Sequence, residues 1–406
     1  MDKVLFIICD GLSDRPIFEL GEKTPLEAAI KPNIDKLTKR GITGIMHTVD
    51  IGVRPGSDVA HLALFGYDIS KYYTGRGPFE AAGYGIKLQP GDIAFRGNFA
   101  TVDKNFIIKD RRAGRIDNTK PLVNVLNGII IDGIRILVKQ GIGHRAAVVF
   151  RGKNLSSLIT DSDPHKEGVK INQSKPLNKN QSARRTAKIV NLFIKKSYEL
   201  LSQHSLNKKR RKEGLPPANI LLLRGAGIMP QLPSFKEKYG LKAACVAGAG
   251  LYKGIAQILG MDILPVASAT GKPDTDVKSK IKEAFMAFKK YDFVFVHIKG
   301  TDVLAEDGDF LGKKKFIEKI DKALEPLIDK RDVMIVLTAD HSTSSYLRMH
   351  TADPVPVLIA GQNLHTDNVE TFGERSVSSG KLGHIQGKHL MPIIIDYLGR
   401  APLVGA

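Results

Sequence analysis

The chain has 406 residues, 42% of them hydrophobic and 25% charged, a composition typical of a globular protein with a sizeable core. Sixty-one lysines and arginines against 42 aspartates and glutamates give a formal net charge of +19. No apolar run approaches the roughly 18 residues that a membrane helix needs, and two cysteines, Cys9 and Cys245, are too few for a disulfide framework. The apolar start lacks the basic region and cleavage site of a signal peptide, so we expect a cytoplasmic protein with no membrane span.

The excess of positive charge has three interpretations. Basic runs at residues 183–188 and 208–212 could bind nucleic-acid phosphates, form a solvated lysine-rich surface, or attract a small anionic substrate. No helix-turn-helix, zinc-finger or aromatic RNA-binding motif accompanies these runs. We therefore expect no nucleic-acid partner and keep a nucleic-acid-binding protein only as an alternative.

The first 90 residues alternate strand and helix signals. Residues 4–9 form a short apolar run that ends on Asp10. The next periodic segment predicts a helix that is interrupted at Pro32 and stops at Gly41.

A turn at Pro55 and Gly56 precedes a third element, a helix for which we expect Ser57 to be the N-cap. Backbone N–H groups at a helix N-terminus favour an anion. Metal ions beside such a serine would also let its hydroxyl ionise and act as a nucleophile.

The middle of the chain differs in pattern from about Gly91 onward. We expect, in order, a hairpin over 92–116, a strand pair over 146–168, a polar loop over 172–183, an amphipathic helix over 181–204 and a strand over 219–227. From Pro230 the alternation of strands and helices resumes. The sequence thus predicts an α/β fold with a mostly parallel sheet and helices on both faces, formed by residues 1–90 and 229–406, with an inserted α+β domain over residues 91–228.

Three apolar strands each run into an aspartate. Besides the strand before Asp10, residues 293–298 are followed closely by Asp302, and residues 332–337 lead to Asp340 and His341. His350 follows nine residues after His341. Because the carboxyl ends of parallel strands meet at one edge of a sheet, these carboxylates would converge and repel each other without a cation. A single aspartate here would more often start a turn or cap a helix, but the set predicts a metal site.

Several segments together carry a family resemblance: ICDGLSDRP, RPGSDVAHLALFGYD, YTGRGPFEAAG, DRRAGRI, HIKGTD, TADHST and HTADPVPV. In this order they resemble the archaeal type of cofactor-independent phosphoglycerate mutase, within the alkaline phosphatase superfamily. The resemblance covers almost the whole chain. It implies an alkaline-phosphatase-like domain with an inserted transferase-like, substrate-binding domain. It also implies interconversion of 3-phosphoglycerate and 2-phosphoglycerate through a phosphoserine, in glycolysis and gluconeogenesis, without added 2,3-bisphosphoglycerate.

The resemblance also implies roles for individual residues. One divalent metal would be held by Asp10, Ser57, Asp340 and His341, and a second by Asp302, Glu306 and His350. The family usually uses Mn²⁺, and this ligand set also suits Mg²⁺ or Zn²⁺. Ser57 would be the nucleophile, and Lys253 would contact the phosphoryl group. The expected substrate-binding residues of the inserted domain are Arg111, Arg112, Arg115, His144, Asp163, His165 and Arg224.

Glu306 departs from the family pattern, which has a histidine four residues after the aspartate. We expect this carboxylate to remain a working ligand, since glutamate binds hard divalent cations well. The nearest alternatives to the mutase are a metal-dependent phosphomonoesterase or a mutase of another phosphorylated metabolite on the same fold. The sequence leaves the oligomeric state open.

Overall fold

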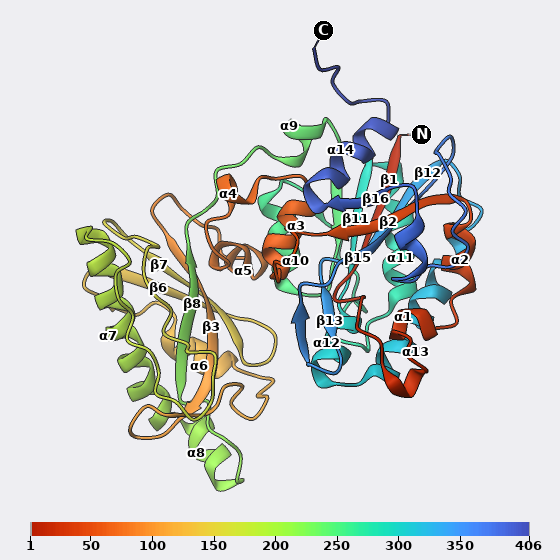
Figure 1. The fold of residues 1–406 in the computed structure, drawn as a ribbon. Helices are drawn as coiled ribbons and strands as arrows, with labels where there is room; N and C mark the ends of the chain where they lie inside the picture. Colours follow the sequence, from red (N-terminus) through yellow and green to blue (C-terminus); the bar gives the residue numbers. More distant parts are fainter. Residues whose placement is uncertain (1, 406) are drawn as a thin grey trace. The chain divides into compact units, whose positions relative to one another are not determined.

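The computed structural model describes residues 2–405, and the chain forms two compact units (Figure 1). Unit 1 combines Met1–Tyr73 with Leu232–Ala406, and unit 2 is Thr74–Gln231. The units thus divide earlier than the predicted boundary at residue 91 and slightly later than that at residue 228. The first difference arises because helix α5 (Gly77–Gly83) packs on the strands of unit 2. No helix within residues 2–405 is long and apolar enough to cross a membrane.

Unit 1 contains an eight-stranded sheet in the order β10-β9-β11-β1-β12-β15-β2-β16. All neighbouring pairs are parallel except the two that involve β15. The strands are β1 (Lys3–Cys9), β2 (Gly41–His47), β9 (Ala243–Val246), β10 (Asp262–Ile263), β11 (Phe293–Ile298), β12 (Val333–Thr338), β15 (Val355–Ala360) and β16 (Gly383–Gln386). A separate hairpin pairs β13 (Ser342–Ser344) with β14 (Met349–Thr351). The predicted mostly parallel sheet is confirmed.

The three aspartate-terminated strands lie next to each other in the middle of this sheet. β1 pairs with β11 on one side and β12 on the other, and the side chains of β11 and β12 are fully buried. In the register, Cys9 lies opposite Ile298 and Ile8 opposite Thr338. The three strands therefore end at the same edge, which is what brings their aspartates together.

Helices cover both faces of the sheet (Figure 1). The interruption predicted at Pro32 is confirmed, because α1 ends at Ala28 and α2 starts at Pro32; Gly41 then opens β2. The helices of unit 1 are α1 (Pro25–Ala28), α2 (Pro32–Thr38), α3 (Ser57–Leu64), α4 (Ile69–Tyr72), α9 (Phe235–Tyr239), α10 (Gly250–Ile258), α11 (Val277–Met286), α12 (Gly300–Asp307), α13 (Phe310–Leu324) and α14 (Gly387–Tyr397). α1, α2, α11 and α13 form one packed group, and α3, α10 and α14 form another.

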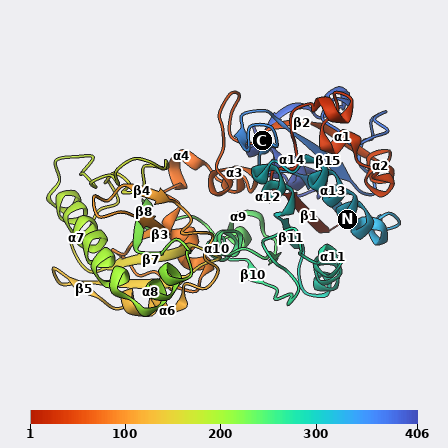
Figure 2. The same ribbon diagram turned by 90° about the horizontal axis from the view of Figure 1, so that it is seen from below.

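Unit 2 is an antiparallel sheet with one long helix packed on it (Figure 2). Its strands are β3 (Ile93–Val102), β4 (Ile108–Asp110), β5 (Ile130–Ile131), β6 (Ile134–Gln140), β7 (Arg145–Arg151) and β8 (Ile220–Gly227). Its helices besides α5 are α6 (Lys120–Leu126), α7 (Gln181–Gln203) and α8 (Ser205–Lys212). Phe95, Phe150 and Phe193 join the two layers in a buried core.

The outcome for the predicted elements of unit 2 is mixed. The β3–β4 hairpin, the helix α7 and the strand β8 are confirmed. The strand pair over residues 146–168 is wrong: β7 pairs with β3 and β6 instead, and residues 154–168, all described by the structure, contain no strand. The sequence analysis did not predict β6, the strand that pairs with β7. Its alternating pattern of buried and exposed residues lies between glycine-containing turns and is hard to recognise beside them.

Candidate active site

His341 lies at the centre of a buried polar cluster at the edge of the unit 1 sheet. Its Nε2 atom is 3.2 Å from Asp10 Oδ1, 3.4 Å from Asp340 Oδ2 and 3.2 Å from Ser57 Oγ. All four side chains are buried. The structure thus brings together the four residues predicted to hold the first metal. Asp10 Oδ1 and Asp340 Oδ2 accept no hydrogen bond of good geometry among the described residues, although the His341 nitrogen lies close to both, and such orphaned buried oxygens fit a cation.

The contact of the other ring nitrogen, Nδ1, determines the tautomer of His341. Nδ1 lies 3.0 Å from Thr343 Oγ1, and that hydroxyl donates to Asp302 Oδ1 over 2.8 Å. Since the hydroxyl hydrogen is used on the carboxylate, the threonine oxygen accepts the Nδ1–H of His341. In the neutral imidazole the Nε2 lone pair then faces the two carboxylates, the arrangement usual for a metal-ligating histidine.

Charge in this cluster shifts the pKa of its members. Burial would lower the pKa of His341, but the carboxylates of Asp340 and Asp10 raise it to about 9. Burial, together with the charge of Asp10, raises the pKa of Asp340. Protonated His341 therefore supplies positive charge that offsets the negative charge of the two carboxylates.

The second predicted set is brought together in part. His350 Nε2 lies 3.5 Å from Asp302 Oδ1, and its Nδ1 donates to the carbonyl of Pro55 over 3.1 Å. The rings of His341 and His350 are stacked with centroids 3.6 Å apart. Asp302, His341 and His350 can offer ligand atoms within 4.8 Å of one another, whereas none of the candidate ligand groups found within residues 2–405 includes Glu306.

Ser57 is not an N-cap, contrary to the prediction. Gly56, with φ of −86° and ψ of 152°, occupies that position, and Ser57 is the first helical residue of α3. Its hydroxyl lies 3.2 Å from His341 Nε2. The hydroxyl is therefore available for chemistry, while the N-terminus of α3 still places backbone N–H groups close to it.

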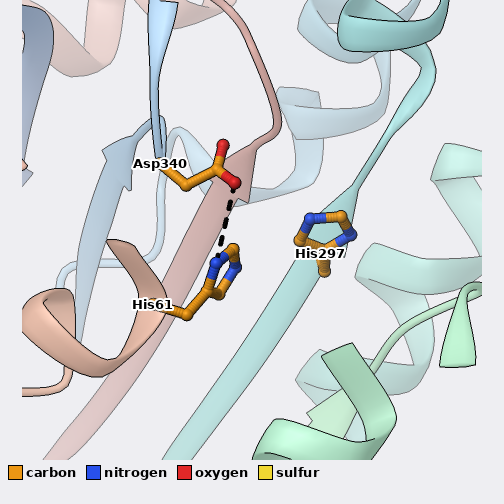
Figure 3. Close-up of side chains that lie close together, drawn as sticks. All are labelled: His61, His297 and Asp340. Carbon is orange, nitrogen blue, oxygen red and sulfur yellow. Dashed lines mark ion pairs between the residues drawn. The ribbon is translucent and has the colours of Figure 1, made fainter. Parts of the chain in front are cut away.

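Two buried histidines that the sequence reasoning missed complete the cluster (Figure 3). His61 Nδ1 donates to the Ser57 carbonyl over 2.6 Å and lies 3.6 Å from Asp340 Oδ2, and His297 Nε2 is 3.1 Å from Asp10 Oδ2. Burial lowers the pKa of His61 and lowers that of His297 to about 3, which favours the neutral form of both imidazoles. His61, His297 and Asp340 form a third candidate ligand group. Because it shares Asp340 with the group around His341, the two groups belong to a single cluster.

Lys299 supplies a positive charge inside the same cluster. Its ammonium group lies 3.0 Å from Asp10 Oδ2 and 2.7 Å from Asp302 Oδ2. The hydroxyl of Tyr252 also donates to Asp10 Oδ2, and its ring is stacked on His297. Burial opposes ionisation, yet Lys299 holds the pKa of both carboxyl groups below the usual range.

A second polar cluster lies within unit 2 and contains part of the predicted substrate site. Arg111 pairs with Asp163 at 3.0 Å, and Arg224 lies 4.0 Å from the same carboxylate. Arg224 also contacts His165 Nδ1 at 3.2 Å, and the His165 backbone N–H donates to Asp163. These four predicted residues are thus brought together around one buried carboxylate.

Three arginines of unit 2 were missed by the sequence reasoning. Glu80 is buried, with Arg76 at 3.0 Å and Arg96 at 3.8 Å. Burial would raise the pKa of Glu80, but the charges of Arg76, Arg96 and Arg145 lower it. Burial lowers the pKa of Arg96, and the positive charges of Arg76, Arg145 and Arg224 lower it further. Positive charge therefore exceeds negative charge in this cluster.

Several arginines of unit 2 have buried N–H donors without a hydrogen-bond acceptor. The Nε atoms of Arg96, Arg111, Arg145 and Arg224 are buried without an acceptor among the described residues. A guanidinium N–H that is buried without a partner favours an anion with oxygen acceptors. The cluster is therefore suited to bind a carboxylate or phosphate.

The remaining predicted substrate residues are less enclosed. His144 is half-buried, and burial together with Arg145 lowers its pKa to about 3. Arg112 and Arg115 are exposed on the segment that follows β4. Their role stays a prediction.

Comparison with known proteins identifies the family. The family model described as 2,3-bisphosphoglycerate-independent phosphoglycerate mutase matches residues 38–207. The 2,3-bisphosphoglycerate-independent phosphoglycerate mutase of Methanococcus aeolicus is 51% identical over 409 residues, which cover 100% of both chains. The chain belongs to this mutase family.

Two solved structures agree with this membership. The cofactor-independent phosphoglycerate mutase of Thermoplasma acidophilum is 38% identical, with a TM-score of 0.69 over 98% of this chain and 100% of that one. The PH0037 protein of Pyrococcus horikoshii is 37% identical, with a TM-score of 0.86 over 100% and 99% of the two chains. The resemblance drawn from the motifs is confirmed, and the alternative of a nucleic-acid-binding protein is not supported.

Two positions that the mutase resemblance singled out stay predictions. Glu306 lies on α12 one turn after Asp302, so the two side chains share a face of the helix, and it is half-buried. Lys253 is half-buried on α10, directly after Tyr252.

Proposed function

We propose that this protein interconverts 3-phosphoglycerate and 2-phosphoglycerate through a phosphoserine formed on Ser57, at a centre of two divalent cations. The observation that carries the proposal is the cluster around His341 Nε2, where a serine hydroxyl and two orphaned carboxylate oxygens lie within 3.4 Å. Membership of the mutase family supports the same activity. Cations bound there would favour ionisation of the serine hydroxyl and offset charge on the transferring phosphoryl oxygens.

The residues of unit 1 would bind the cations and the phosphoryl group. Asp10, Asp340 and His341, together with Ser57, would hold one cation, and Asp302 and His350 would hold the other, with Glu306 as a further ligand. The N–H groups at the start of α3 would stabilise the phosphoryl group on Ser57. Lys253 would contact the same group. Mixed oxygen and imidazole donors suit Mn²⁺, which we propose as the working ion, although Mg²⁺ and Zn²⁺ accept the same ligands.

The arginine cluster of unit 2 would bind the glycerate part of the substrate. Its orphaned Nε–H groups provide donors for a carboxylate, and the planar guanidinium fork matches two oxygens at once. Retention of glycerate while phosphate resides on Ser57 is what separates a mutase from a phosphatase, because a free glycerate would be replaced by water. The proposed location of this reaction is the cytoplasm.

One assay tests the proposal. Protein stripped with EDTA is incubated with 3-phosphoglycerate, with and without added Mn²⁺, while 2-phosphoglycerate and free phosphate are measured in the same samples. We expect 2-phosphoglycerate only with the metal, little phosphate, and neither product from Ser57→Ala. Phosphate as the main product would instead establish a phosphomonoesterase, and full turnover in EDTA without protein-bound metal would exclude the cation centre.

A further inference from the structure

Lys299 joins the two halves of the proposed cation centre. It follows β11 directly, and its side chain is only 13% exposed. The ammonium group contacts Asp10 at 3.0 Å and Asp302 at 2.7 Å, which are the proposed ligands of different cations. Lys299 therefore pairs with two carboxylates at once and does not form a one-to-one ion pair.

The contacts of each carboxylate are divided between its two oxygens in the same way. Oδ2 of Asp10 accepts from Lys299 and Tyr252 and lies 3.1 Å from His297 Nε2, and Oδ2 of Asp302 accepts from Lys299. The Oδ1 atoms face the other way: that of Asp10 lies 3.2 Å from His341 Nε2, and that of Asp302 lies 3.5 Å from His350 Nε2. Each aspartate therefore has its Oδ2 atom held by Lys299 and its Oδ1 atom directed to a candidate metal-ligating histidine, and Oδ1 of Asp302 also accepts from the Thr343 hydroxyl over 2.8 Å.

We propose that Lys299 is a positioning residue that restricts Asp10 and Asp302 to one ligand oxygen each and acts as a built-in cation of the centre. The inference rests on the proposed two-cation site. Metal-ligating carboxylates are commonly held by an outer hydrogen bond, which orients the ligating oxygen. Here one ammonium group does this for both halves of the centre.

The position of Lys299 has two consequences of opposite sign. Without metal, its charge offsets buried carboxylates that would otherwise repel each other, so it stabilises the empty centre. With metal, the same charge repels a divalent cation a few ångströms away, so it weakens binding. Removal of Lys299 should therefore destabilise the metal-free protein and tighten metal binding at the same time.

A purely structural ion pair predicts a different result. If Lys299 only held the local fold, its removal would lower the stability of both forms equally and would loosen the ligands. Affinity for metal would then fall or stay unchanged. The direction of the change in Mn²⁺ affinity separates the two explanations.

The test compares Lys299→Met with wild type and with Lys299→Arg, which keeps the charge. Mn²⁺ affinity and stoichiometry are measured by calorimetry, and Tm is measured in EDTA and in saturating Mn²⁺. We expect Lys299→Met to lower the Mn²⁺ Kd by about tenfold or more, and to lower Tm in EDTA more than in Mn²⁺. Lys299→Arg should restore both values towards wild type. The electron paramagnetic resonance spectrum of bound Mn²⁺ should also change in Lys299→Met, because Oδ2 of Asp302 loses its donor and becomes available as a ligand.

Two further variants keep the test decisive. Tyr252→Phe removes an uncharged donor from the same Asp10 oxygen, so it should lower the Mn²⁺ Kd less than Lys299→Met does. This comparison remains possible if Lys299→Met folds only in the presence of metal. Lys280, a buried lysine that donates to the His297 carbonyl over 3.0 Å, is the matched control, and Lys280→Met should change Mn²⁺ affinity far less.

An unchanged or weaker affinity in Lys299→Met, with equal losses of Tm in both states, would overturn the inference. A wild-type protein that binds no divalent cation would instead overturn the proposed function, so the two failures are distinguishable.

Discussion

Metal binding to this protein should compete with a proton on His341. Asp340 and Asp10 raise the pKa of this buried imidazole to about 9 in the metal-free chain, and only the neutral imidazole can ligate a metal. Neutral His341 is thus the minor form at pH 7, because the pKa lies about two units higher. We therefore expect Mn²⁺ affinity to rise about tenfold per pH unit between pH 6.5 and 8.5, with about one proton released from His341 per bound metal.

The same pKa shift predicts the opposite trend for the stability of the metal-free protein. A pKa raised above the unfolded value of about 6.5 stabilises the fold fully below pH 6.5, and this contribution is lost as the pH rises towards 9. The shift of about 2.5 units corresponds to about 3 kcal/mol of free energy of unfolding. Metal-free protein should thus become less stable over the pH range in which it binds metal more tightly.

Calorimetry at pH 6.5, 7.5 and 8.5, in two buffers with different heats of protonation, measures both the affinity and the protons released. Chemical denaturation in EDTA at the same three pH values measures the stability. His341→Asn is the control, because it should bind Mn²⁺ weakly and without the tenfold dependence per pH unit. Equal wild-type affinities at pH 6.5 and 8.5 would refute the competition.

Three shorter predictions concern the other residues. Ser57→Ala should abolish turnover but lower the free energy of unfolding by less than about 1 kcal/mol, because Gly56 and not Ser57 is the N-cap of α3. Appreciable turnover in the folded variant would exclude Ser57 as the nucleophile. Arg145→Gln should raise KM for 3-phosphoglycerate roughly 10- to 100-fold in steady-state assays, whereas Arg184→Gln, exposed on α7, should not. Glu306→Gln should lower Mn²⁺ affinity and turnover by roughly tenfold or more while Glu306→His retains activity; near-wild-type metal content and rate in Glu306→Gln would remove this residue from the centre.

The sequence predicted the aspartates of the metal centre because position and chemistry coincide there. A buried parallel strand is a continuous apolar run, so the first carboxylate after it is conspicuous, and sheet geometry brings such residues to one edge. The same reasoning located His341, which follows Asp340 directly. The N-cap role of Ser57 failed because a glycine can occupy that position, and sequence alone does not show which residue has the extended backbone.

The residues that sequence reasoning missed are single polar side chains within apolar surroundings. Arg96 and His297 lie inside fully buried strands, and His61 lies one turn after Ser57 on α3. Each has an ordinary explanation when considered alone, and only tertiary contacts reveal its partners. A charged or imidazole side chain inside an otherwise apolar strand was nevertheless a usable signal, since such a group is rarely buried without a partner.

Formal charge limits what the proposed centre can hold. Asp10, Asp302 and Asp340 bring three negative charges and Lys299 one positive charge, all of them largely buried. Two divalent cations, with His341 neutral, would leave a net charge of two positive units, which a phosphoryl dianion on Ser57 would cancel. A fourth carboxylate, from Glu306, would make the phosphorylated centre negative by one unit. The phosphoserine should therefore be less stabilised here than in a relative with a neutral histidine at that position, and Glu306→His should accumulate more of it at steady state.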